Sequence, residues 1–270
     1  MAADMGNDPA QLKTRKPRMR IDRLYRYPVK GLTAEALEQA WLEAGQAIPW
    51  DRAFALAQGD AGFDPVAPVW LPKTNFMCLR SNARIAALRA SFDPRTGLLT
   101  LLAPGGLSLV ANALDAGERG RIAAWLAAYL GEEARGVPGF HYVPGHVFGD
   151  QRVPVISLIN QASLTDYETR VGARRHRRRF RANIFFSGAP AWAEREWLDR
   201  EISVGGARMR VVRHTTRCPA TEVNPETAVR DADPIAELKT FYGHADLGVH
   251  AVVVEGGEIA LGDSIEFLSP

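Results

Sequence analysis

Short runs in which apolar and polar residues alternate, separated by turn residues, recur along most of this chain. Such alternation places every second side chain on a buried face, as in a half-exposed β-strand. Turn signals such as Phe92–Gly97 (FDPRTG) separate the runs at intervals of about eight to twelve residues, which predicts a barrel or a sandwich. In the first half we expect strands near residues 21–25, 36–43, 52–58, 83–88, 98–102 and 107–110.

The second half contains further strand-like runs. Residues 153–159 form a continuous apolar run of the kind found in buried strands, and residues 183–188 (NIFFSG) and 201–204 follow. Two long runs, 248–255 and 258–268, surround Gly256-Gly257, a pair that favours a β-hairpin turn. We expect this hairpin to seal a barrel.

Three segments instead have helical signals. The strongest runs from Asp115 to Leu130, with Asp115 as its cap and Gly131 after its last turn. Ser163, with Asp166 three residues later, predicts the capped start of a short helix, and Asp233-Pro234 predicts the start of another. We expect the first helix to be the longest and to serve packing.

Together these elements predict a mainly β (α+β) fold, built from two fused β-barrels with a few short helices. Residues 1–18 are polar and rich in turn formers, which predicts a disordered tail. Residues 19–112 then form a barrel-like N-terminal unit, residues 113–150 a helix and linker, and residues 151–270 a second barrel.

Composition excludes several classes of protein. The 270 residues carry a net charge of +2, which indicates neither a nucleic-acid partner nor a membrane surface. No run approaches the roughly 18 apolar residues of a membrane span, and the first residues lack the apolar core of a secretory signal. The two cysteines, Cys78 and Cys218, form no CxxC motif, so a reducing compartment is the simpler expectation. We expect a cytoplasmic protein.

The segment Val211–Pro225 (VVRHTTRCPATEVNP) carries the clearest candidate chemistry. It begins as an alternating strand and breaks into polar residues around Cys218, between Arg217 and a proline. A cysteine at a strand end beside a guanidinium lies where a thiolate is stabilised and accessible. A small buried apolar residue is the alternative, and the spacing alone leaves both open. Cys78 lies in an apolar setting (FMCLR) and is expected to be inert.

Six of the eight residues in Arg174–Arg181 (RRHRRRFR) are arginine. This run is a solvated loop, a nucleic-acid or nuclear-targeting patch, or a site of anion capture by guanidinium groups. The third interpretation is favoured because the run leads directly into a strand. Arg181 and Asn183 are two apart, so as strand residues they would point to the same face. We expect an exposed loop beside a cavity mouth, guiding an anionic cofactor or an acidic partner.

Six short motifs follow one another along the chain: YPVK (27–30), DR (51–52), ASLTD (162–166), FRANI (180–184), TRC (216–218) and GD (262–263). In this order they resemble the MOSC family, with a MOSC N-terminal β-barrel in front. The family is related to the C-terminal domain of molybdenum cofactor sulfurases and to the mitochondrial amidoxime reducing component. The resemblance extends from about Arg20 to Leu268.

The resemblance implies a molybdenum cofactor (Mo-molybdopterin), with Cys218 as a catalytic thiolate ligand of the molybdenum. Soft thiolate ligation suits such a metal, and Arg217 would help to keep the sulfur ionised. The resemblance also implies a set of side chains that hold the pterin and its phosphate or line the cofactor: Lys30, Arg52, Ser163, Arg181, Asn183, Thr216, Arg217 and His250.

Some positions depart from the family pattern. Relatives usually have serine after the lysine of YPVK and proline within FRANI, where this chain has Gly31 and Ala182. Two cysteines are too few for a four-cysteine iron–sulfur cluster, so electrons would come from a separate protein.

The implied function is a molybdenum-cofactor oxidoreductase that reduces small N-hydroxylated compounds with an external electron donor. The alternative is a carrier that delivers the cofactor, or that carries sulfur as a persulfide on Cys218. Nucleic-acid binding through the arginine run is the least favoured, because neither a helix-turn-helix pattern nor an aromatic platform accompanies the run.

Overall fold

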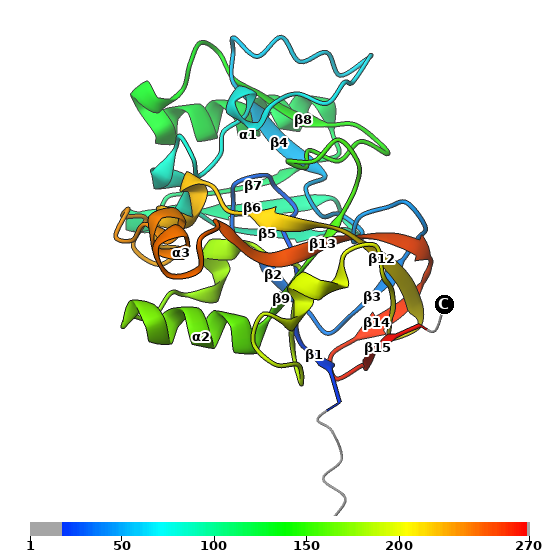
Figure 1. Cartoon of the computed structure of the whole chain (residues 1–270). Coiled ribbons are helices and arrows are strands. Elements are labelled where there is room, and N and C mark those ends of the chain that lie inside the picture. The colour runs from blue at the N-terminus through cyan, green and yellow to red at the C-terminus, as the bar shows by residue number, and fades with distance from the viewer. Residues whose placement is uncertain (1–17, 269–270) are drawn as a thin grey trace, which may run out of the picture.

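Short strands account for most of the regular structure in residues 18–268, the part of the chain that the computed structural model describes (Figure 1). The predicted mainly β class is confirmed, while the expected tail lies almost wholly outside the described residues. The α-helices in this range are α1 (Ala116–Leu130), α2 (Gln161–Val171) and α3 (Pro234–Tyr242). The strands are β1 (Arg20–Arg26), β2 (Glu35–Leu37), β3 (Gln39–Leu42), β4 (Phe54–Ala57), β5 (Arg89–Asp93), β6 (Leu98–Leu102), β7 (Ser108–Asn112), β8 (Gly139–Tyr142), β9 (Ile156–Asn160), β10 (Ile184–Ser187), β11 (Glu201–Val204), β12 (Ala207–Thr216), β13 (Asp246–Glu255), β14 (Gly257–Ala260) and β15 (Ile265–Phe267).

The largest sheet has eight strands in the order β15-β11-β12-β13-β9-β10-β1-β2. Neighbouring strands are antiparallel except β9 and β10, which are parallel. The sheet curls so that β1 meets the segment before β15: Arg20 forms a bridge with Ser264, and the Ile265 N–H donates to the Met19 carbonyl at 3.0 Å. The curled sheet therefore closes around an apolar core.

Strands from the N-terminal part of the chain also contribute to the barrel that was predicted for residues 151–270. β1 pairs with β10, and β3 pairs with β14. We retain the division into residues 19–112, 113–150 and 151–270 as a proposal for the domains, with these strands crossing the boundary.

The predicted C-terminal hairpin is wrong. β13 pairs with β12 and β9, whereas β14 pairs with β3 and β15 with β11. A Cβ at Gly256 would lie 2.5 Å from the carbonyl oxygen of Leu42, and one at Gly257 would lie 2.2 Å from that of Gly206. The two glycines therefore permit a close approach of backbones where the chain leaves the sheet.

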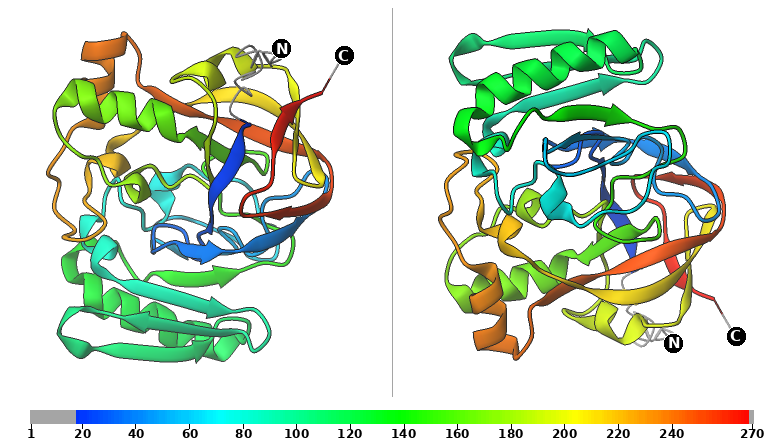
Figure 2. Two further views of the ribbon diagram at one scale, coloured as in Figure 1. Left: turned by 90° about the horizontal axis from the view of Figure 1, so that it is seen from below. Right: turned by 90° about the horizontal axis from the view of Figure 1, so that it is seen from above.

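A second layer consists of the three-stranded sheet β5-β6-β7 and α1. Figure 2 shows this layer at one end of the molecule. The Asp115 side chain caps α1 by accepting from the Glu118 N–H at 2.8 Å, and Gly131 ends the helix, so both predicted ends are confirmed. Ile122 and Leu126 are among the residues that α1 buries.

The strand predicted over residues 83–88 is wrong, because Ala83–Ala87 form a 3₁₀-helix. Ile85 and Ala86 are adjacent and both buried, so the apolar positions here do not alternate. No helix in residues 18–268 combines the length and apolar character needed to cross a bilayer.

Candidate functional site

One cavity of ≈ 400 Å³ collects nearly all the residues that the sequence analysis selected. Its walls come from the bend after β1, the turn before β4, the segment before β9, the turn before β10 and the end of β12. Ser163 does not line this cavity. The selected residues in the walls are Lys30, Arg52, Arg181, Asn183, Thr216, Arg217, Cys218 and His250.

The walls are strongly cationic. Eight Lys or Arg side chains and two Asp side chains line the cavity, so it has an excess of positive charge that favours an anionic ligand. The carboxylates already have partners: Asp51 is bound by Arg52, and Asp150 is bound by both Lys30 and Lys73.

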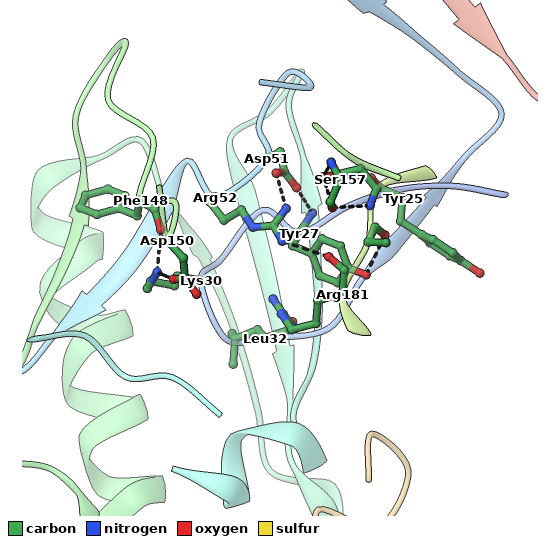
Figure 3. A network of polar contacts seen from close by, with 12 residues as sticks. Tyr25, Tyr27, Lys30, Leu32, Asp51, Arg52, Phe148, Asp150, Ser157 and Arg181 are labelled. Carbon is green, nitrogen blue, oxygen red and sulfur yellow. Dashed lines mark hydrogen bonds and ion pairs between the residues drawn. The ribbon is translucent and has the colours of Figure 1, made fainter. Parts of the chain in front are cut away.

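Lys30 projects into the cavity from the bend after β1. Its backbone N–H donates to the Phe54 carbonyl at 2.8 Å, which ties the bend to β4. Its Nζ donates to the Phe148 carbonyl at 2.9 Å and to Asp150 Oδ1 at 2.5 Å (Figure 3). Burial lowers the pKa of Lys30, although the Asp150 carboxylate opposes this effect.

Arg52 and Arg181 lie beside the ring of Tyr27 (Figure 3). Their guanidinium carbons are 4.6 and 4.3 Å from the ring centroid, within cation–π range. Arg181 donates to the Leu32 carbonyl at 2.7 Å and has no carboxylate partner within residues 18–268. Burial lowers the pKa of Arg181 to about 10. Arg52 is paired with Asp51, which outweighs burial and raises its pKa.

Both arginines adopt a left-handed backbone, with φ of 52° at Arg52 and 50° at Arg181. This conformation costs a residue with a side chain about 1–2 kcal/mol, and such strain gathers at functional sites. The prediction that Arg181 and Asn183 share a strand face is wrong. Arg181 ends the 3₁₀ turn Arg177–Phe180, and β10 begins at Ile184.

Asn183 nevertheless lines the cavity and joins three strands at its wall. Its Oδ1 accepts from the Ser157 N–H at 3.1 Å and from the Ser157 hydroxyl at 2.9 Å. Its Nδ2 donates to the Tyr25 carbonyl at 3.2 Å. The amide of Asn183 thus fixes the relative position of β1, β9 and β10.

The arginine run is not the exposed loop that the sequence predicts. Arg175 forms an ion pair with Glu237 of α3. Arg179 is buried, donates to the Glu222 carbonyl at 2.8 Å and pairs with Asp231. Carboxylates from a distant part of the chain neutralise these charges. The sequence of the arginine run alone does not reveal such distant partners.

Cys218 lies two residues after the end of β12, and its sulfur has a neighbour that the sequence analysis did not predict. Lys73 Nζ donates to Cys218 Sγ at 3.3 Å and to Asp150 Oδ2 at 3.0 Å. Burial lowers and Asp150 raises the pKa of Lys73, and the net direction is upward. The sequence analysis missed Lys73 and Asp150, which lie in irregular segments without periodicity. Cys78 also lines this cavity, so its setting is not the purely apolar one that was predicted.

Arg217 does not direct its guanidinium hydrogen bonds at the neighbouring sulfur. It donates to the Phe180 carbonyl at 2.8 Å and to the Leu247 carbonyl. Burial lowers the pKa of Arg217 to about 10. Arg217 therefore contributes charge to the wall, while Lys73 makes the direct contact with Cys218.

Five buried polar atoms of residues in the cavity walls lack a hydrogen-bond partner within the described residues: Trp70 Nε1, Arg179 Nε, Thr215 Oγ1, Arg217 Nε and His250 Nδ1. Such atoms typically cost about 1–3 kcal/mol when left unpaired. Burial and Arg217 lower the pKa of His250 to about 3, so its imidazole is neutral. The Thr216 hydroxyl donates to Asp246 at 2.7 Å, so Thr215 is the residue with an available hydroxyl.

Comparison with known protein families identifies the family to which this chain belongs. The MOSC domain profile matches residues 144–266, and the profile of the MOSC N-terminal beta barrel domain matches residues 18–116. The chain belongs to the MOSC family.

Curated relatives are similar to parts of this MOSC protein. Mitochondrial amidoxime-reducing component 1 of Mus musculus is 30% identical over 123 residues, which are 41% of this chain and 36% of that protein. Mitochondrial amidoxime reducing component 2 of Rattus norvegicus is 37% identical over 87 residues, which are 32% of this chain and 25% of that protein. Among solved structures, the YUAD protein from Bacillus subtilis aligns over 93% of this chain and 96% of that chain, with 14% identity and a TM-score of 0.44.

Gly31 stands where the family motif has serine, and the structure gives a reason. Its φ is +86°, and a Cβ would lie 2.7 Å from Ile85 Cδ1 and 3.1 Å from the Met77 carbonyl oxygen. We expect Gly31→Ser to lower the free energy of unfolding by at least about 1–2 kcal/mol, measured by urea unfolding. Gly45→Ser is the control, because Gly45 has φ +72° but open space around it. Equal losses in both variants would exclude the steric contact as a cause.

Ser163 is the one selected residue outside the cavity. α2 begins at Gln161 with Asn160 as its cap, so the predicted helix start at Ser163 is wrong. The Ser163 hydroxyl is fully buried, donates to Glu194 Oε2 at 2.8 Å and accepts from the Trp192 N–H at 2.7 Å. These contacts are structural, and we assign Ser163 no cofactor role.

The buried Glu194 should make stability depend on pH. Burial raises its pKa above the ordinary value of 4.5, although the Ser163 hydroxyl opposes the shift. Between 4.5 and the raised pKa, the folded protein keeps a proton that the unfolded chain loses, so this group's contribution to stability falls as pH rises. Glu194→Gln removes that loss. The free energy of unfolding of Glu194→Gln, relative to that of the parent protein, should rise with pH above 4.5 by at most about 1.4 kcal/mol per pH unit. Above the raised pKa of Glu194, this difference should level off. Parallel urea-unfolding profiles for the two proteins would contradict this.

Proposed function

We propose that this MOSC protein binds a molybdenum cofactor and reduces N-hydroxylated compounds with electrons from a separate donor protein. One observation carries the proposal: a single cavity holds the Cys218 thiol together with eight cationic and only two acidic side chains. Thiolate sulfur suits soft transition metals, and guanidinium and ammonium groups suit the phosphate of a pterin cofactor.

The side chains present fit such a group. Within residues 18–268, no cluster of three or more His, Cys, Asp or Glu side chains could hold a metal by itself. A metal here would therefore bring most of its own ligands, as one held by the dithiolene sulfurs of a pterin does, and Cys218 would add a thiolate. Arg52 and Arg181 would hold the phosphate. The unpartnered atoms of Thr215 and His250 would bond to polar groups of the pterin.

The reaction balances with two electrons and two protons. The N–O bond of the substrate breaks, the nitrogen is reduced to an amine or amidine, and the oxygen leaves as water. When bound, the cofactor would supply a metal that exchanges two electrons with the substrate. The donor protein supplies those electrons. The residues of the chain hold and orient the reactants: Cys218 holds the metal, and the cationic walls hold the anionic cofactor.

The substrate class is supported by the printed names of the relatives. Proteins similar to part of this chain are named amidoxime-reducing components, and an amidoxime carries an N–OH group. The cavity volume lies within the usual range for small-molecule sites, about 300–1,000 Å³.

The test uses protein from a host that makes the cofactor and from a matched host that does not. With reduced methyl viologen as the electron source, only the first preparation should convert benzamidoxime to benzamidine, measured by chromatography. Molybdenum binding without any conversion would contradict the reductase and favour a carrier that delivers the cofactor.

A further inference from the structure

Lys73 lies beside Cys218 although the two belong to distant parts of the chain. It begins the 3₁₀ turn Lys73–Asn75, in the long segment between β4 and β5. The turn is held by backbone contacts, including the Gln58 N–H donating to the Asn75 carbonyl at 2.8 Å. The backbone at Lys73 is therefore anchored, and its ammonium lies between Asp150 Oδ2 at 3.0 Å and Cys218 Sγ at 3.3 Å.

The hydrogen bonds of Lys73 leave one donor available. A lysine ammonium has three N–H donors and no acceptor. Within the described residues, Cys218 Sγ and Asp150 Oδ2 take two of them. The Lys73 side chain lines the cavity and is 24% exposed, whereas Lys30, which Asp150 also binds, is only 6% exposed. Of the two lysines on Asp150, Lys73 is the more exposed to a ligand in the cavity.

We propose that Lys73 is a substrate-binding residue, whose remaining N–H donates to the oxygen of the N-hydroxylated group beside Cys218. This inference rests on the proposed function and adds a residue that none of the six sequence motifs contains. Asp150 and Cys218 fix two of the three donors, so the direction of the third is set before the substrate binds. A pre-oriented, charged donor binds an oxygen acceptor more strongly than a neutral one does.

The contact distinguishes substrate from product. Reduction removes the oxygen that Lys73 binds, and an amidine product is a cation that the ammonium repels. A site that hydrogen-bonds a substrate oxygen disfavours the analogue that lacks it. Lys73 therefore favours binding of the N–OH compound and release of the reduced product.

Three variants test the proposal on molybdenum-loaded protein. Lys73→Met removes the donors and the charge, and Lys73→Arg keeps both. Lys239→Met is the matched control, because Lys239 is an exposed lysine of α3 outside the cavity walls. Dissociation constants for benzamidoxime and benzamidine are measured by calorimetry without reductant, so that no turnover occurs. Molybdenum content, KM and kcat are then measured for each protein.

Lys73→Met should raise the dissociation constant and the KM for benzamidoxime roughly ten-fold or more, the value of one hydrogen bond from a charged group. Benzamidine should bind to Lys73→Met at least as tightly as to the wild type. Lys73→Arg should recover most of the benzamidoxime affinity, and Lys239→Met should change neither ligand. All variants should keep their molybdenum.

Unchanged benzamidoxime affinity in Lys73→Met would overturn the proposal, and so would an equal loss for benzamidoxime and benzamidine. Loss of molybdenum in step with affinity would also overturn it, since Lys73 would then serve cofactor retention. A wild type that holds molybdenum but reduces no benzamidoxime rejects the proposed function itself. An active wild type with an unaffected Lys73→Met rejects this inference alone.

Discussion

Exchange of Cys218 for serine should lower molybdenum-dependent reduction by at least about 100-fold. Mutation of a group that hydrogen-bonds to a metal ligand typically lowers metal affinity or activity by about 10- to 100-fold. Loss of the ligand itself should have a larger effect. A hydroxyl is a harder and far less acidic donor than a thiol. The fold should persist, because serine is similar in size and Cys218 is only partly buried, just beyond the end of β12.

Cys78→Ser is a demanding control, because Cys78 lines the same cavity as Cys218. Cys78 is buried, and its backbone N–H donates to Asn82 Oδ1 at 3.3 Å. We expect this variant to keep its activity. Both variants are compared by benzamidoxime turnover and by circular dichroism. Full turnover in Cys218→Ser together with loss in Cys78→Ser would show that the site is wrongly assigned.

Exchange of Arg181 for methionine should change cofactor affinity and stability in different directions. The folded protein holds this guanidinium against a carbonyl and the Tyr27 ring, and burial lowers its pKa to about 10. Removing a buried cation without a carboxylate partner should leave the free energy of unfolding of the cofactor-free protein unchanged or higher. Cofactor affinity should fall roughly ten-fold or more, because a hydrogen bond to a charged group is worth about 1.5–3 kcal/mol.

Arg174→Met is the matched control for Arg181→Met. Arg174 is an exposed arginine of the same run and lies outside the cavity walls. Pterin fluorescence of the extracted cofactor and urea unfolding of the cofactor-free proteins provide the two readouts. If Arg181→Met lost stability and cofactor in parallel, its role would be structural.

The sequence predicted the elements that depend on neighbours along the chain. α1 could be predicted because Asp115 and Gly131 mark its ends with local signals. The C-terminal hairpin could not, because the pairing of β14 with β3 joins segments about 200 residues apart. A pair of glycines is typical of a hairpin turn. Here Gly256 and Gly257 instead allow their backbone to lie close to the backbones of Leu42 and Gly206.

The site shows the same limit. Motifs brought attention to residues such as Lys30 and Cys218, and the fold brings these into one cavity. Ser163 was selected through the resemblance to the family, and its spacing to Asp166 also predicted a helix start, whereas Asn160 is the actual cap. Lys73 and Asp150 gave no signal, since their role arises only where distant segments meet at the sulfur.

Elemental analysis for molybdenum tests the central claim most directly. The wild type from a cofactor-producing host should contain molybdenum in proportion to Cys218, one atom for each chain. Cys78→Ser should match it, and protein from a cofactor-deficient host should contain none. Wild-type protein with no more molybdenum than this negative sample would contradict the account.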